Sequence, residues 1–180
     1  WLASLIMPGL MLAGALLARH NVKLQRGDRV GAFRAASILF IASLTAWALG
    51  STHVSDVGVE INRLFQAVGS GLLDAAILWL TYLGLEPYVR RTSPDSLIGW
   101  TRLIAGRWND PHVGRDVLIG ASAGLLMTVL FPLYYLLPPL FGGPEPIPVL
   151  PDLRPFMGVR HVLGGLVLQV SSAISDAMLG

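Results

Sequence analysis

Few residues in this chain carry side chains that could perform chemistry, and they are widely separated. The sequence contains no cysteine, so disulfides, thiolate nucleophiles and cysteine-bound metals are excluded. No HExxH zinc motif, phosphate-binding loop or GxSxG nucleophile elbow occurs. The sequence therefore predicts that the protein is not an enzyme. The four histidines lie far apart in the chain: His20, His53, His112 and His161.

Asp74 is the most unusual ionisable residue, because it falls inside an apolar run, GSGLLDAAILWL. A carboxyl group at membrane depth is costly and suggests a function such as ion passage or a buried pair. The simpler interpretation is a carboxyl that hydrogen-bonds to a neighbouring helix, which we favour because no second carboxylate lies nearby in the sequence. His161 begins another apolar run and is a candidate ligand for haem or a pigment metal. A hydrogen-bonded histidine at a membrane boundary is the more ordinary alternative.

Glu86 and Arg90 are spaced as a favourable ion pair on a helix. The stretch EPYVR that they bound also resembles half of the EExxxR motif of CAAX-type intramembrane proteases. That motif requires paired glutamates, whereas Leu85 occupies the first position here, and the later Phe and His motifs are not present at the right spacing. We therefore reject the protease. A membrane enzyme that used Glu86 and Arg90 would need both in one intramembrane pocket.

The composition indicates that these residues lie in a membrane protein. The chain is 53% hydrophobic and only 13% charged, whereas soluble domains carry about 25% charged residues. Its five apolar segments are each near the length that crosses a bilayer. We predict an all-α, polytopic membrane helix bundle that forms a single membrane domain over residues 1–180. Because both ends lie in apolar runs, we interpret the chain as a fragment of a longer protein. The predicted spans are about 1–18, 32–49, 61–82, 116–137 and 159–179.

A polar loop at residues 82–116 separates the third and fourth predicted spans. Within it, apolar residues from about 95 to 108 follow helical spacing over a length too short to cross a membrane. We predict an amphipathic helix that lies in the cytoplasmic interface. A docking helix for a soluble partner has the same pattern and stays open. The candidate structural or lipid-facing residues of this loop are Glu86, Arg90, Arg91, Trp100, Arg102, Arg107 and Trp108.

The loops differ in charge, and this difference predicts the orientation. Lys and Arg gather in residues 19–34 and 86–115, but are rare in residues 50–60 and 138–158. The positive-inside bias places the first two intervals in the cytoplasm of a bacterial inner membrane, with the amino end outside and the carboxyl end cytoplasmic. Residues 19–34 could also bind anionic lipid headgroups, although an orientation signal is a sufficient explanation.

Two features mark the ends of the fourth predicted span. Asp116 is expected to cap its amino end. Seven prolines in residues 138–155 predict an extended loop after its carboxyl end, because proline lacks the N–H that a regular helix requires.

Two stretches of the chain have a distinctive amino-acid sequence. One is LEPYVRR followed by SLIGWTRLIAGRWNDPHVGRDVLIG, and the other, earlier in the chain, is ARHNVKLQRGDRVGAFRAA. Together they cover about Ala18 to Gly120, and they resemble a membrane region of some large acidobacterial and myxobacterial proteins described as serine/threonine protein kinases. In such proteins a cytoplasmic kinase domain precedes the membrane crossing. The glycine-rich, HRD and DFG motifs of kinases are absent here, so the resemblance implies a membrane anchor or sensor module without kinase activity.

The sequence thus predicts a non-catalytic integral membrane module that acts as an anchor, signal-coupling region or accessory subunit of a larger membrane assembly. The alternative is a transporter-like or cofactor- or pigment-binding membrane protein that uses Asp74 or a histidine. We predict membrane lipids and other integral membrane subunits as partners, no nucleic acid and no cofactor, with pigment or haem left open. The first hypothesis predicts no water-lined cavity, and the alternative predicts that Asp74 faces one.

Overall fold

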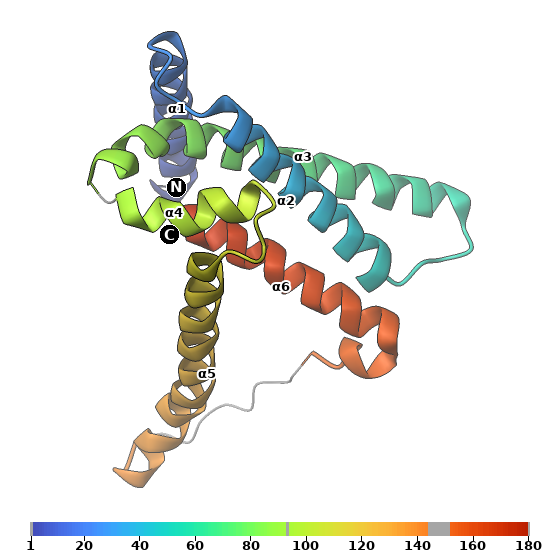
Figure 1. Ribbon diagram of the computed structural model, residues 1–180. Helices are drawn as coiled ribbons and strands as arrows, with labels where there is room; N and C mark the ends of the chain where they lie inside the picture. The colour runs from blue at the N-terminus through green and yellow to red at the C-terminus, as the bar shows by residue number, and fades with distance from the viewer. Residues whose placement is uncertain (1, 93, 144–151, 180) are drawn as a thin grey trace. The chain divides into compact units, whose positions relative to one another are not determined.

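The computed structural model describes residues 2–92, 94–143 and 152–179. All the secondary structure of these residues is helical, which confirms the all-α prediction (Figure 1). The elements in chain order are α1 (Leu2–Lys23), α2 (Arg29–Gly50), α3 (Val57–Thr92), α4 (Pro94–Ile104), α5 (Pro111–Leu140), the short 3-10 helix η1 (Arg154–Met157) and α6 (Val159–Leu179).

The chain divides into two compact units. The first combines Trp1–Pro94 with Leu153–Gly180, and so contains α1, α2, α3, η1 and α6; the second is Asp95–Asp152, which contains α5 and nearly all of α4. The single membrane domain over residues 1–180 stays a prediction.

In the first unit, α2 packs against both α3 and α6, and α1 packs against α3. The largest fully buried side chains are Leu39, Leu78 and Leu83. Small residues allow helix backbones to approach closely in membrane proteins, and α2 offers a series of them to its neighbours: Gly31, Ala32, Ala35, Ala36 and Ala46. The end of α2 meets the start of α6, so these two helices run in opposite directions (Figure 1).

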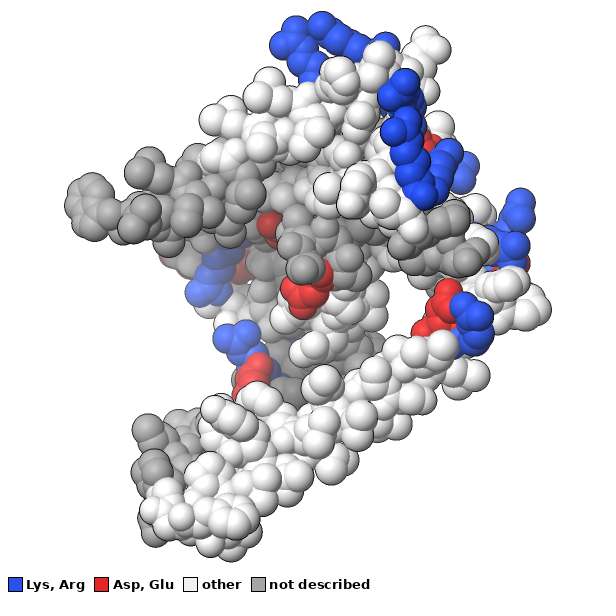
Figure 2. Space-filling model, turned by 90° about the vertical axis from the view of Figure 1, so that its left-hand side faces the viewer, with Lys and Arg blue, Asp and Glu red and all other residues white. Residues whose placement is uncertain are grey.

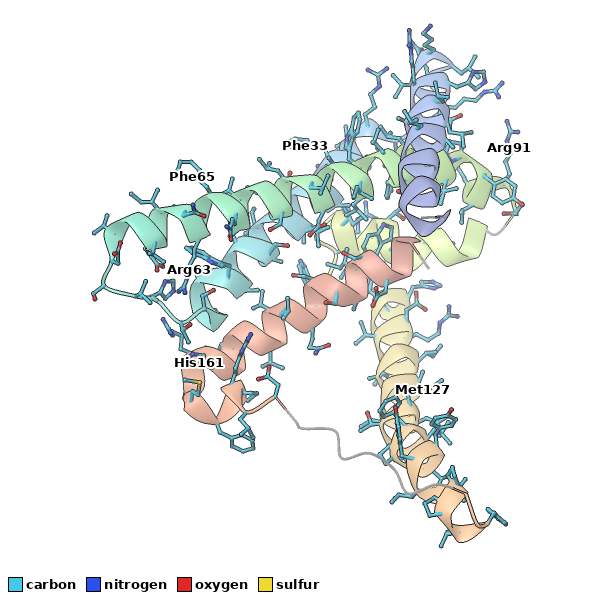
Figure 3. The ribbon with its side chains drawn as sticks, turned by 180° about the vertical axis from the view of Figure 1, so that it is seen from behind. Phe33, Arg63, Phe65, Arg91, Met127 and His161 are labelled. Atoms are coloured by element: carbon cyan, nitrogen blue, oxygen red, sulfur yellow. The ribbon has the colours of Figure 1, made fainter. Side chains whose placement is uncertain are left out.

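Three of the described helices, α2, α3 and α5, are long and apolar enough to cross a membrane. They contain the second, third and fourth predicted spans. Among the described residues visible in Figure 2, most are neither Lys or Arg nor Asp or Glu. Large apolar side chains such as Phe33, Phe65 and Met127 point away from the helices (Figure 3) and are 68%, 72% and 65% exposed. An apolar environment around these helices is what such surfaces require.

Helix α3 is longer than the predicted span. Its 36 residues correspond to about 54 Å at 1.5 Å per residue, whereas the hydrocarbon core is about 30 Å thick. The helix continues through Pro87 to Thr92. The stretch LEPYVRR, which we expected within a loop, is therefore the last part of α3.

The expectations for the ends of α5 were wrong in two respects. The helix begins at Pro111, and its N-cap is Asp110, whose carboxylate accepts a hydrogen bond from the His112 N–H at 3.0 Å; Asp116 is not the cap. Proline at the first helical position is favourable because its missing N–H would be unpaired there anyway. At the other end, α5 continues through Pro138 and Pro139 to Leu140. Of the predicted extended loop, residues 144–151 lie outside the described residues.

Helix α4 begins close to the predicted position but ends earlier, at Ile104 instead of residue 108. Gly106 explains this end, since its φ of +79° lies in the left-handed region that favours glycine. The Arg107 N–H donates to the Arg102 carbonyl and the Gly106 N–H donates to the Leu103 carbonyl, which is the Schellman pattern of a helix end.

Candidate functional site

In the first unit, the end of α1 and the start of α2 lie against Tyr82, Leu83 and Gly84 of α3. Asn21 in α1 donates from Nδ2 to the carbonyls of Leu83 and Gly84 in α3, each at 3.0 Å. In a regular helix the Leu83 carbonyl would accept the N–H of residue 87, but Pro87 has none. Asn21 therefore supplies the donor that Pro87 lacks, and this explains how α3 continues through a proline.

Asp28 and Tyr82 lie beside this contact, at the start of α2. The Asp28 carboxylate caps α2 by accepting the Gly31 N–H at 2.9 Å. Tyr82 is only 3% exposed, and a Cβ added at Gly31 would lie 2.9 Å from its hydroxyl oxygen. Glycine at position 31 thus leaves room for the Tyr82 hydroxyl beside the start of α2.

Glu86 is the most deeply buried charged residue of this region, with 3% of its surface exposed. Its carboxylate forms an ion pair with the Arg90 guanidinium, one helical turn further along α3. The Arg90 side chain is 59% exposed, so the pair has one buried and one solvated partner. Arg91 is also exposed, at the end of α3 (Figure 3). We call the group Asn21, Asp28, Tyr82, Glu86 and Arg90 the helix junction.

We expect Asn21→Ala to lower the free energy of unfolding by about 1–3 kcal/mol, because the buried Leu83 carbonyl would lose its donor. Pro87→Ala restores an N–H at the position that this carbonyl faces. The same Asn21→Ala change should therefore cost much less in a Pro87→Ala background. The measurement is a double-mutant cycle on the thermal midpoint in detergent micelles, with the exposed neighbour His20→Ala as control. Equal costs of Asn21→Ala in the two backgrounds would contradict this role.

A second polar feature of the first unit is a cavity between α2, α3 and α6. Its volume is about 290 Å³, and both Asp74 and Asp176 line it. The other lining residues are Leu39, Ser43, Ile77, Leu78, Leu168, Ser171, Ser172 and Ser175. Asp74 thus faces a polar cavity shared with a second carboxylate, Asp176, which lies far from it in the sequence.

The residues of α6 in this cavity follow helical spacing. Ser171 and Ser175, and likewise Ser172 and Asp176, are four positions apart and so lie on one side of the helix. This SSxxSD pattern is the sequence signal that could have identified the partner of Asp74. The lining offers carboxylate and hydroxyl oxygens, which are the ligands of hard cations. Among the residues described, no three His, Cys, Asp or Glu side chains come together as a metal-binding group.

His161 lies near the start of α6, and neither of its ring nitrogens has a hydrogen-bond partner within the described residues. The structure therefore does not show the hydrogen-bonded boundary histidine that we favoured. Its role as a ligand stays a prediction.

In the second unit, Arg102 and Asp110 join α4 to the start of α5. The Arg102 Nη1 donates to both carboxylate oxygens of Asp110, at 2.7 and 2.8 Å. This hydrogen bonding lowers the pKa of the Asp110 carboxyl, and the His112 N–H contributes in the same direction. The Asp110 carboxylate thus forms the ion pair with Arg102 and also caps α5, and both interactions fix the turn between α4 and α5.

The remaining candidate residues of this unit are Trp100, Arg107 and Trp108. Arg107 contributes with Arg102 to an open cavity on α4. The indole N–H of Trp100 is buried and has no hydrogen-bond partner in the part of the chain that the structure describes. Trp108 is 73% exposed and follows α4 in the turn.

Comparison with family models, with curated proteins and with solved structures finds no match for this chain.

Proposed function

We propose that this protein is a non-catalytic integral membrane module that anchors a larger assembly and couples a signal across the bacterial inner membrane. The observation that carries the proposal is the continuity of α3. This helix links the loop at residues 51–56 to the basic end at Arg90 and Arg91 without a break. Asn21 supports it at the one residue, Pro87, where a helix is expected to weaken. A continuous helix can transmit a displacement from one of its ends to the other.

The proposed topology has five spans. Helices α1 and α6 have 22 and 21 residues, which is the length that a span requires, about 20 residues. Together with α2, α3 and α5 they give an outside amino end and a cytoplasmic carboxyl end. In this topology α4 lies in the cytoplasmic interface, and the basic residues at the end of α1, at the start of α2 and at Arg26 between them face anionic lipid headgroups.

Helix α5 supports the accessory-subunit part of the proposal. Of its 30 residues only Val113 is buried, and its apolar side chains are exposed along most of its length. Lipid tails or helices of other membrane subunits would cover such a surface.

Thiol labelling tests the topology directly, because residues 1–180 contain no cysteine and an introduced thiol is the only one among them. We expect a membrane-impermeant maleimide to label Ser55→Cys in intact cells, and to label Thr92→Cys only after the membrane is permeabilised. Labelling of both from the same side would refute the proposed crossing of α3.

Native mass spectrometry of the gently solubilised complex, with an absorption spectrum, then tests the assembly. Stable association with other subunits is the expected result, and a colourless, solitary protein would count against it.

A second candidate function is a cation- or proton-linked membrane protein, as the alternative interpretation of the sequence held. The observation in its favour is the cavity that Asp74 shares with Asp176 and four serines. This candidate predicts that reconstituted vesicles show an ion flux that falls at least tenfold in both Asp74→Asn and Asp176→Asn. The leading proposal predicts no such flux in the unaltered protein. Gln169→Ala, an exposed change on α6, is the control.

A further inference from the structure

The loop between α2 and α3 contains a histidine with both ring nitrogens engaged. His53 Nε2 lies 3.0 Å from the Ala48 carbonyl oxygen in the last turns of α2. His53 Nδ1 contacts a carboxylate oxygen of Glu60 near the start of α3. A backbone carbonyl and an ionised carboxylate can only accept hydrogen bonds, so each contact requires an N–H on the ring. A neutral imidazole has one N–H, and only the imidazolium ion satisfies both contacts.

The same loop is held by three helices of the first unit. The second oxygen of Glu60 accepts the Val54 N–H at 3.3 Å. Arg63 in α3 donates to the Thr52 carbonyl at 2.7 Å, and Arg160 in α6 donates to the Ser51 carbonyl at 3.0 Å. Figure 3 shows Arg63 and the neighbouring His161 at the same end of the first unit. Opening the His53 contacts would therefore free His53 from Ala48 and Glu60, while Arg63 and Arg160 still connect the start of the loop to α3 and α6.

We propose that protonation of His53 closes a latch that holds the loop at residues 51–56 against α2 and α3, and that deprotonation opens it. In the closed state, His53 bridges Ala48 and Glu60. In the open state, the neutral ring has a donor for only one of them, and Glu60 no longer faces a positive charge on the ring. Glu60 is then held less firmly, and so is the Val54 N–H that its second oxygen accepts. The latch concerns only this loop and its helices, so it stands independently of the proposed function.

The groups around His53 raise its pKa and so favour the protonated ring. Its pKa is raised above the usual value of about 6.5, first by the hydrogen bond to the Ala48 carbonyl and then by the one to Glu60, while the charge of Arg160 acts in the opposite sense. Arg63 is a further cation beside Glu60. Asp56 is a nearby acid, whose carboxylate accepts the Val59 N–H at 3.1 Å at the start of α3.

The sign of the pH effect follows from the raised pKa. A group whose pKa is higher in the folded than in the unfolded state contributes stability that is fully present below the unfolded pKa and is lost as the pH rises through the folded pKa. The latch is thus closed under acidic conditions and opens on the alkaline side of the ordinary histidine range. In the topology proposed above, the loop would respond to the pH outside the cell.

NMR on the whole protein in micelles, with ¹³C-labelled histidine rings, tests the latch. Only four histidines contribute signals, and His53→Gln assigns the relevant one. We expect His53 to titrate above pH 6.5 and its pKa to fall in Glu60→Gln, a change that keeps the shape of the side chain. A pKa at or below 6.5, or no response to Glu60→Gln, would overturn the proposal.

Hydrogen exchange supplies the second measurement. Below the His53 titration, we expect the Val54 amide to exchange at least tenfold more slowly in the unaltered protein than in His53→Gln at the same pH. Above the titration the two rates should converge. Equal rates at every pH would refute the latch. The other three histidine signals report whether each variant is folded, so loss of the fold cannot be mistaken for either outcome.

Discussion

Gly164→Ala is expected to force α2 and α6 apart and to lower the free energy of unfolding by about 1–3 kcal/mol, the usual cost of overpacking. A Cβ at this position would lie 2.6 Å from the Gly50 nitrogen, 2.8 Å from the Gly50 Cα and 3.0 Å from the Leu49 carbonyl carbon. All three are backbone atoms, so no side-chain rotation can relieve the contact. The helices themselves must move.

The neighbouring Gly165 provides a matched control. A Cβ added there meets nothing within 4 Å. Replacing a helical glycine by alanine should then stabilise the protein by about 0.5–1 kcal/mol, because the unfolded chain loses conformational freedom. The midpoint of thermal unfolding in detergent should thus move in opposite directions for the two variants. Equal shifts would mean that α2 and α6 do not approach closely at Gly50.

The same pair of variants also probes the polar cavity. Helix α2 contributes Ser43 to its lining, and α6 contributes Asp176. A displacement of α6 at Gly164 would change the distance between these walls, whereas Gly165→Ala would leave it unchanged. An ion flux, if one is found, should therefore respond to Gly164→Ala but not to Gly165→Ala.

The sequence predicted the helices well because apolar length and periodicity are local properties. The apolar runs at residues 32–49, 61–82 and 116–137 all lie within helices that are long and apolar enough to cross a membrane. The i,i+4 spacing of Glu86 and Arg90 predicted a contact within one helix, and the ion pair is present. The spacing could not predict that Glu86 is buried, since burial depends on which other helices pack against this part of α3.

What the sequence did not predict depends on contacts between distant residues or on a choice between neighbouring residues of the same type. Pro87 lies in the segment expected to be a polar loop, but α3 continues through it because the compensating donor, Asn21, comes from another helix. Asp116 lies nearer the apolar run than Asp110, yet Asp110 is the cap because Pro111 begins the helix. Asp74 and Asp176 belong to different helices, and only the packing of α6 beside α3 brings them to one cavity.

The two partners of the buried ion pair are expected to differ greatly in their effect when removed. Arg90→Leu leaves the Glu86 carboxylate, 3% exposed, without its ion-pair partner. Its oxygens have no hydrogen-bond partner among the described residues that could replace the guanidinium. An uncompensated buried charge typically costs about 3–5 kcal/mol, and we expect the lower end because Arg90 is itself well solvated.

Glu86→Met should cost far less, because it replaces the buried carboxylate by an apolar side chain of similar size and leaves Arg90 in water. Exchanging a buried ion pair for apolar residues is often neutral. The double variant Glu86→Met with Arg90→Leu should therefore be more stable than Arg90→Leu alone, and Arg91→Leu, at an exposed position, is the control. Thermal midpoints in micelles provide the comparison. A large loss in Glu86→Met itself would show that the carboxylate has a role beyond the ion pair, and would reopen the interpretation of Glu86 as a functional group.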